Sequence, residues 1–159
     1  PRRPFSMPGA TMTWALTVAA VIERRGRYLF VEETDGLHLD RVLNQPAGHV
    51  EPGEGLVEAA IREVREETGL PFTPEALVGI YPLQARNGKD YCRVCFAGTV
   101  PEDQEARPED PEILGTRWLT LDELEQANLR SALVLRCVKD ARAGQSLPLE
   151  VVAAPLRER

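Results

Sequence analysis

Long apolar runs and an excess of positive charge are both absent from this chain of 159 residues. No apolar run approaches the roughly 18 residues of a membrane-spanning helix, so we expect no membrane partner. Lysine and arginine together number 19 against 25 aspartates and glutamates, which gives a formal net charge of −6. Because a protein that follows a nucleic-acid backbone needs a basic face, we expect no nucleic-acid partner either. An anionic small molecule would have to be bound locally, by a metal ion and a few arginines.

Cysteine is also scarce, with three residues in the chain, and no signal-like apolar segment is visible. An odd number of cysteines without such a segment indicates a reducing compartment, so we expect a cytoplasmic protein. Cys92 and Cys95 form a C-x-x-C pair. Positions three apart on a strand face opposite sides of a sheet, so we expect ordinary core and edge residues here rather than redox or zinc chemistry.

Length and composition indicate one globular domain with its own core. Hydrophobic residues make up 43% of the chain and charged residues 28%, which are ordinary values for a soluble protein. Residues 1–12 carry three prolines, two arginines and no periodicity, which predicts a loose N-terminal arm. We expect the folded domain to span residues 13–152 and a short tail to occupy residues 153–159. The sequence leaves the oligomeric state open.

Apolar periodicity and turn residues predict an order of strands and helices. Strand patterns cover residues 14–22, 28–32, 77–85, 91–100 and 116–119. Helix patterns cover residues 56–68, 120–124 and 131–143. Short turns at 24–27 and 86–90 join the first four strands into two hairpins. Strands mixed with flanking helices predict an α/β fold built in layers.

The stretch from residue 48 to residue 70 is a glycine-rich turn that opens into a helix crowded with carboxylates. At about 100° per residue, an apolar face carries Val57, Ala60, Ile61, Val64 and Thr68. Glu63, Glu66 and Glu67 gather on another face, and we call these three residues the carboxylate cluster. Like charges three and four residues apart repel each other, so the cluster needs open water or a bound cation. Oxygen ligands of this kind suit Mg²⁺ or Mn²⁺, whereas the simpler alternative is a solvated acidic surface.

The spacing of this stretch favours the cation. Gly48 stands six residues before Glu54, and eight residues further on come Arg62-Glu63, Val64, Glu66-Glu67, Gly69 and Leu70. This arrangement resembles the Nudix box at every specified position. The resemblance implies the Nudix fold, a mixed β-sheet between α-helices. It also implies a Mg²⁺-dependent hydrolase of a nucleoside diphosphate linked to another group, with the metal held by the carboxylate cluster and the carbonyl of Gly48.

Catalytic roles within the box follow from the same resemblance. Glu63 or Glu67 is the better candidate for a general base, although a glutamate from a later loop is an open alternative. Arg62 lies four residues from both Glu58 and Glu66, so it can pair within the helix and orient a ligand carboxylate. Further candidates for an extra metal ligand lie within or just after the acidic, proline-rich segment 101–111. These candidates are Glu109, Asp110 and Glu112.

Three segments outside the box, LNQPAGHVE, ANLRSALV and AGQSLPLEVV, are similar to the NudJ-type phosphatases, a branch of the Nudix family. That branch implies removal of orthophosphate from nucleoside tri- and diphosphates, and from thiamine-type pyrophosphates. Candidates for contact with this small-molecule substrate are Gln45, Arg93, Asn128 and Arg130. The alternatives are hydrolysis of nucleotide sugars or dinucleoside polyphosphates, and a non-catalytic nucleotide-sensing domain, which an intact set of glutamates disfavours.

Overall fold

The computed structural model describes residues 13–159, so the predicted arm over residues 1–12 lies outside the described residues. Strands are β1 (Trp14–Arg24), β2 (Arg27–Thr34), β3 (Arg41–Asn44), β4 (Ala47–His49), β5 (Thr73–Gln84), β6 (Asp90–Thr99), β7 (Gly115–Leu119) and β8 (Leu147–Pro148). Helices are α1 (Leu56–Thr68), α2 (Leu121–Glu125), α3 (Ala132–Arg142) and a 3-10 turn η1 (Leu149–Val151). No helix within residues 13–159 is long and apolar enough to cross a membrane.

The strands form one mixed sheet. Their order is β3-β2-β1-β6-β5-β8, with β4 paired to β1 and β7 paired to β2. β1 and β6 run parallel, while the other pairs of named strands are antiparallel. The two predicted hairpins, β1–β2 and β5–β6, are confirmed.

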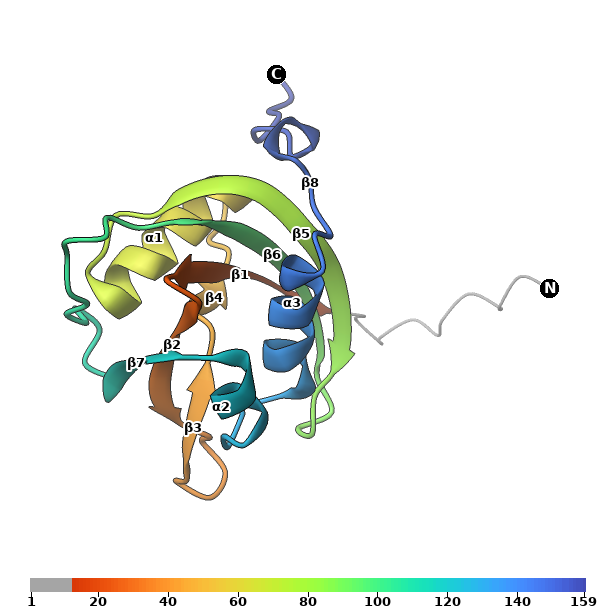
Figure 1. The fold of residues 1–159 in the computed structure, drawn as a ribbon. Helices are drawn as coiled ribbons and strands as arrows, with labels where there is room; N and C mark the ends of the chain where they lie inside the picture. The colour runs from red at the N-terminus through yellow and green to blue at the C-terminus, as the bar shows by residue number, and fades with distance from the viewer. Residues whose placement is uncertain (1–12) are drawn as a thin grey trace.

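Two apolar cores lie on the two faces of β1, as its alternating side chains require. Val18, Ala20 and Ile22 pack into the core beneath α1. Ala19 and Val21 point the other way, into the core that α2 and α3 cover. The molecule is therefore a sheet between helices (Figure 1), and the predicted α/β sandwich is confirmed.

Helix α1 has the predicted bounds because both ends carry the expected signals. Gly69 ends it in a left-handed conformation with φ 73°, and its N–H donates to the carbonyl of Arg65. A methyl group on Gly69 would also overlap the carbonyl oxygen of Arg107, so glycine is required there twice over. The predicted apolar face needs a correction. Ile61 is 39% exposed, while the buried residues are Ala59, Ala60, Val64, Glu67 and Thr68.

The acidic segment after β6 packs against the C-terminal end of α1. The backbone N–H of Arg107 donates to the carbonyl of Thr68 at 2.7 Å. The N–H groups of Glu109 and Asp110 both donate to the carbonyl of Glu66, at 2.9 and 2.8 Å. Carbonyls in the last turn of a helix lack intrahelical partners, so the segment satisfies them. It also brings the carboxyl group of Asp110 to the carboxylate-rich end of α1.

The C-terminal helices form where their caps predict. Thr120 and Glu123 make the predicted capping box at the start of α2. Ser131 caps α3, whose Val134 and Val138 are fully buried in the core shared with the sheet. Beyond η1, Val152 is partly buried against the core beneath α1. The domain boundaries at residues 13 and 152 stay predictions.

Candidate functional site

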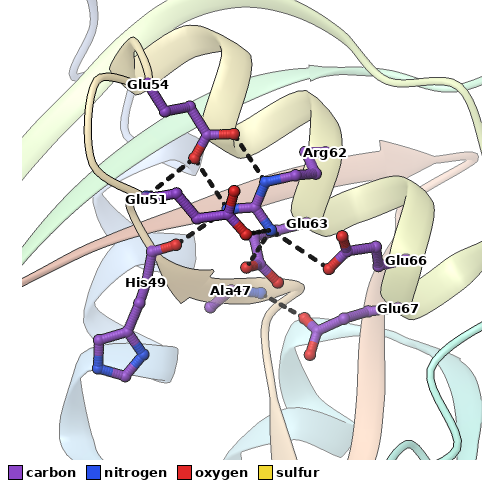
Figure 2. Close-up of polar contacts among 8 residues, drawn as sticks. All are labelled: Ala47, His49, Glu51, Glu54, Arg62, Glu63, Glu66 and Glu67. Atoms are coloured by element: carbon purple, nitrogen blue, oxygen red, sulfur yellow. Dashed lines mark hydrogen bonds and ion pairs between the residues drawn. The ribbon is translucent and has the colours of Figure 1, made fainter.

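Arg62 is the centre of the polar contacts on α1 (Figure 2). Its Nε and Nη2 donate to the two carboxylate oxygens of Glu54 at 2.7 and 2.9 Å, a bidentate pair. Its Nη1 donates to Glu63 at 2.9 Å and to Glu66 at 3.3 Å. Its Nη2 also donates to the backbone carbonyl of His49 at 3.0 Å. One guanidinium thus joins the turn before the helix, strand β4 and two members of the carboxylate cluster.

The partner that holds Arg62 most firmly comes from the turn and not from the helix. The hydrogen bonds that Arg62 donates to Glu54 are the main cause that raises the pKa of Arg62 above its ordinary value. The same contact lowers the pKa of Glu54. The predicted pairing of Arg62 with Glu58 does not occur in the structure described for residues 13–159, whereas the predicted pairing with Glu66 does. The fixed guanidinium therefore holds the turn against α1.

Gly48 lies where any side chain would collide with the site. It is the middle residue of β4 and pairs with Val18 of β1. A methyl group on Gly48 would overlap the whole carboxyl group of Glu63. The Glu63 carboxyl group therefore rests directly against bare backbone. Burial there raises the pKa of Glu63, and Arg62 opposes the shift.

Glu67 is the most deeply buried member of the carboxylate cluster, with 5% of its surface exposed. Its Oε1 accepts the backbone N–H of Ala47 at 2.7 Å. Burial is the main cause that raises the pKa of Glu67 to about 9, and the Ala47 N–H opposes it. The charges of Glu33, Glu63 and Asp110 raise the pKa further. Three other carboxylates thus lie close to Glu67, and the group carries a proton at neutral pH when no cation is bound.

The predicted extra ligands separate in the structure. Asp110 is half-buried and close enough to raise the pKa of Glu67, whereas Glu109 and Glu112 are exposed. Sequence reasoning missed Glu33, which lies near the end of β2 and also acts on Glu67. Its only sequence signal was an acidic residue at the end of an apolar strand. Its place beside α1 depends on tertiary packing.

The residues fit a hard divalent cation in chemistry. Carboxylate and carbonyl oxygens suit Mg²⁺ or Mn²⁺, and the bare backbone at Gly48 leaves room for the carboxyl group of Glu63. A bound cation would favour the ionised form of Glu67, which lies buried among other carboxylates. Within residues 13–159, no three histidine, cysteine, aspartate or glutamate side chains converge into ligand geometry, and Arg62 binds both Glu63 and Glu66. The metal-binding roles stay predictions.

The four predicted substrate contacts fall into two groups. Gln45 and Arg93 are buried and bonded to each other, with Arg93 Nη1 donating to Gln45 Oε1 at 3.0 Å. Asn128 and Arg130 are exposed, and each has a hydrogen-bond partner from a distant part of the sequence. The Asn128 amide donates to the carbonyl of Arg41 at 2.9 Å. The Arg130 guanidinium donates to Glu33 at 3.0 Å.

The C-x-x-C pair is divided between environments, as alternation along a strand predicts. Cys95 is buried in the core that α3 covers, while Cys92 is half-buried. The neighbour of Cys95 is Cys137 of α3, whose thiol is the first cause that raises the pKa of Cys95. Gln45 Nε2 also donates to the sulfur of Cys95 at 3.7 Å. Cys92 and Cys95 therefore share no site.

Comparisons with known proteins identify the family to which this chain belongs. A sequence profile of the NUDIX domain matches residues 13–136, which are most of the chain. The chain therefore belongs to the Nudix family, and it is an enzyme that hydrolyses phosphoanhydride bonds. Enzymes of this family use divalent metal ions and act on small nucleotide-type molecules.

The chain is similar to particular members of the Nudix family. The chain is 38% identical over 138 residues to the protein called Phosphatase NudJ in Escherichia coli K12, covering 86% of this chain and 89% of that protein. The same values hold for Phosphatase NudJ of Shigella flexneri. A solved NUDIX hydrolase from Nitrosomonas europaea is 43% identical, with a TM-score of 0.82 over 89% of this chain and 97% of the other. The E. coli ORF135 protein is 26% identical, with a TM-score of 0.67 over 84% and 94%.

Replacing Arg62 by lysine is expected to lower kcat/KM at least about tenfold and the melting temperature by about 2–8 °C. Lysine keeps the charge but cannot hold Glu54 with two parallel bonds while also reaching Glu63. Steady-state kinetics and thermal unfolding measure both effects. Arg65→Lys is the matched control, because Arg65 is an exposed arginine of the same helix. Equal losses in the two variants would contradict the central role of Arg62.

Without metal, the protein is expected to lose stability as the pH rises from about 5 to about 9. The folded pKa of Glu67, about 9, exceeds the ordinary glutamate value of about 4.3. The folded state therefore keeps a proton that the unfolded chain releases, so stability falls between the two pKa values. The raised pKa of Glu63 acts in the same direction. Thermal unfolding in EDTA across this range checks the slope, which Glu67→Gln should flatten. A flat profile for the wild-type protein would contradict the burial of an ionisable Glu67.

Proposed function

We propose that this enzyme is a Mg²⁺-dependent phosphatase that releases orthophosphate from nucleoside tri- and diphosphates, with thiamine-type pyrophosphates as further substrates. The observation that carries the proposal is the carboxylate cluster, organised by Arg62 and pressed against Gly48. The 38% identity to Phosphatase NudJ over most of both chains supports the type of reaction. Mn²⁺ would serve the same ligands.

The site residues divide the work by their positions. Glu63, Glu66, Glu67 and the carbonyl of Gly48 would hold the cation, which neutralises phosphate oxygens and acidifies a water molecule. Arg62 keeps Glu63 and Glu66 in place through one oxygen of each carboxylate, and the other oxygen has no hydrogen-bond partner within residues 13–159. Glu63 or Glu67 would accept the proton of the attacking water. Gln45, Arg93, Asn128 and Arg130 would contact the substrate.

A substrate panel with product identification tests this proposal. Purified protein with Mg²⁺ is incubated with nucleoside tri- and diphosphates, a thiamine-type pyrophosphate, nucleotide sugars and dinucleoside polyphosphates. We expect orthophosphate to appear directly from a nucleoside triphosphate and to stop with excess EDTA. Pyrophosphate as the sole inorganic product would place the attack at the α-phosphorus and contradict the phosphatase assignment. Faster turnover of a nucleotide sugar or dinucleoside polyphosphate would favour those substrates instead.

A non-catalytic nucleotide-sensing domain is the alternative from another class. It would bind a nucleotide without producing phosphate under any of these conditions. The complete set of box glutamates, with the charged network around Arg62, opposes this alternative, because a binding-only domain has no need for a hydrolytic metal site.

A further inference from the structure

Arg93 is a buried cation whose hydrogen-bond partners within residues 13–159 are uncharged. It lies on β6, 8% exposed, and burial is the main cause that lowers its pKa. Its hydrogen-bond partners are neutral amide oxygens, Gln45 Oε1 at 3.0 Å and Asn44 Oδ1 at 3.4 Å. Within residues 13–159, its buried Nε has no partner and it forms no salt bridge. An arginine is rarely buried without a paired anion, because desolvation of the charge is costly.

Strand pairing places Arg93 next to the carboxylate cluster. Thr17 of β1 pairs with Arg93 on one side and with His49 on the other, so these three residues form one row across the sheet. The carbonyl of His49 is bonded to Arg62. Gln45, the partner of Arg93, precedes by two residues Ala47, whose N–H binds Glu67. The guanidinium lies on the sheet face of Cys95, away from α1, and the charge of Glu33 acts on both Arg93 and Glu67, which links this face to the carboxylate cluster.

The glutamate whose charge acts on Arg93 is bonded to other residues. Glu33 accepts hydrogen bonds from Arg130 Nη1 at 3.0 Å and from Asn44 Nδ2 at 3.1 Å. Burial is the leading cause that raises the pKa of Glu67 and lowers the pKa of Arg93, whereas the charge of Glu33 raises both, so it adds to the first shift and opposes the second. Arg93 and Arg130 therefore share the single negative charge of Glu33. Asn44 links Glu33 to Arg93, because its Nδ2 donates to Glu33 and its Oδ1 accepts from Arg93.

We propose that Arg93, held in position by Asn44 and Gln45, is a receptor for a phosphate dianion, the outermost phosphoryl group of the substrate and the orthophosphate it becomes. The identity of this anion rests on the proposed function, whereas its binding does not. A planar guanidinium with free N–H groups presents two parallel donors to a phosphate. The two amides fix its orientation without cancelling its charge, so the bound anion supplies the missing counter-charge.

This assignment has a signature in stability that a structural arginine lacks. Desolvation of a buried charge is costly, and the replacement of buried ionic groups by apolar side chains of similar volume is often neutral or stabilising. Arg93→Met is therefore expected to melt at or above the wild-type temperature when no anion is present. An arginine whose role was to hold β6 to the segment around Gln45 would lose stability on the same replacement.

The test compares thermal unfolding of wild type, Arg93→Met and Arg93→Lys in EDTA, with inorganic phosphate titrated at constant ionic strength. Wild type is expected to show a saturable rise of about 3–6 °C at tenfold excess of phosphate over its dissociation constant. Arg93→Met should show no rise, and Arg93→Lys should bind at least about tenfold more weakly. Arg117→Met, a change of an exposed arginine on β7, is the matched control and should keep the full rise.

Several results would overturn the receptor. A phosphate-dependent rise that survives in Arg93→Met would do so, and so would the absence of any rise in wild type. If Arg93→Met fails to fold, Arg93→Lys provides the test. Undiminished phosphate binding in that variant would show that the guanidinium of Arg93 is not the receptor.

Steady-state kinetics with Mg²⁺ and a nucleotide test separately whether Arg93 binds the phosphoryl group of the substrate and whether it binds the orthophosphate product. Loss of the receptor is expected to raise KM about tenfold or more and to abolish competitive inhibition by orthophosphate. An unchanged KM would overturn the assignment to the substrate. Because the titration uses neither metal nor turnover, its failure would leave the proposed hydrolysis standing. Conversely, a wild type that binds phosphate but hydrolyses nothing would overturn the proposed function alone.

Discussion

Changing both Glu66 and Glu67 to glutamine is expected to reduce kcat by about a hundredfold or more while leaving the metal-free protein at least as stable as wild type. The loss in rate follows if these carboxylates hold the cation, since a metal supplies several kcal/mol of charge stabilisation in the transition state. The gain in stability follows from Glu67, which is 5% exposed and close to three other carboxylates. A glutamine oxygen can still accept the N–H of Ala47.

Thermal unfolding with and without millimolar Mg²⁺, together with steady-state kinetics, measures these effects. Wild type should show a saturable rise in melting temperature with Mg²⁺, because the ion binds only the folded state. The double variant should lose that rise. Glu58→Gln removes an exposed glutamate from the same helix and should change neither property. Wild-type turnover in the double variant would reduce Glu66 and Glu67 to surface residues and would contradict the proposed metal site.

Gly48→Ala is expected to remove most of the activity with little effect on folding. The new methyl group would occupy the space of the Glu63 carboxyl group. That group is the end of a flexible side chain, so it can swing away at small cost to the fold. The displaced carboxylate would lose its contact with Arg62, and we expect kcat/KM to fall about a hundredfold.

The matched control for Gly48→Ala is Gly115→Ala on β7. Its new methyl group would meet a single atom, Glu32 Oε2, at an ordinary 3.8 Å. This variant should keep both activity and melting temperature. Gly48→Ala should match it in circular dichroism and in melting temperature to within about 4 °C. Full activity in Gly48→Ala would show that the position of Glu63 against β4 has no part in catalysis.

Local signals in the sequence were sufficient for most of the elements. The bounds of α1 follow from Gly69, which takes the left-handed conformation that ends the helix, and from Pro71 immediately beyond. The capping box of Thr120 and Glu123 fixed the start of α2 in the same way. These signals act within a few residues, so they can be read without knowledge of the fold.

What the sequence could not provide depends on tertiary packing. The wheel of α1 separates Ile61 from Glu67 by angle, but the position of the sheet decides that Ile61 is 39% exposed and Glu67 is 5% exposed. Helical spacing likewise offered Glu58 to Arg62, whereas the turn folds back and brings Glu54 within 2.7 Å. Glu33 joined the site only because the fold brings the end of β2 close enough for its charge to act on Glu67. The charge of the site was thus visible in the sequence, and its burial was not.

The parallel ladder between β1 and β6 also sets an order of events during synthesis. It runs from the pair Trp14 and Asp90 to the pair Ile22 and Gly98. β1 therefore cannot form this ladder until β6, which is synthesised much later, is available. The entire Nudix box leaves the ribosome before that strand does. A helix of 13 residues is marginal on its own in water, and the face it buries packs against a sheet that is still incomplete. The carboxylates therefore remain unassembled on the nascent chain until translation has passed β6.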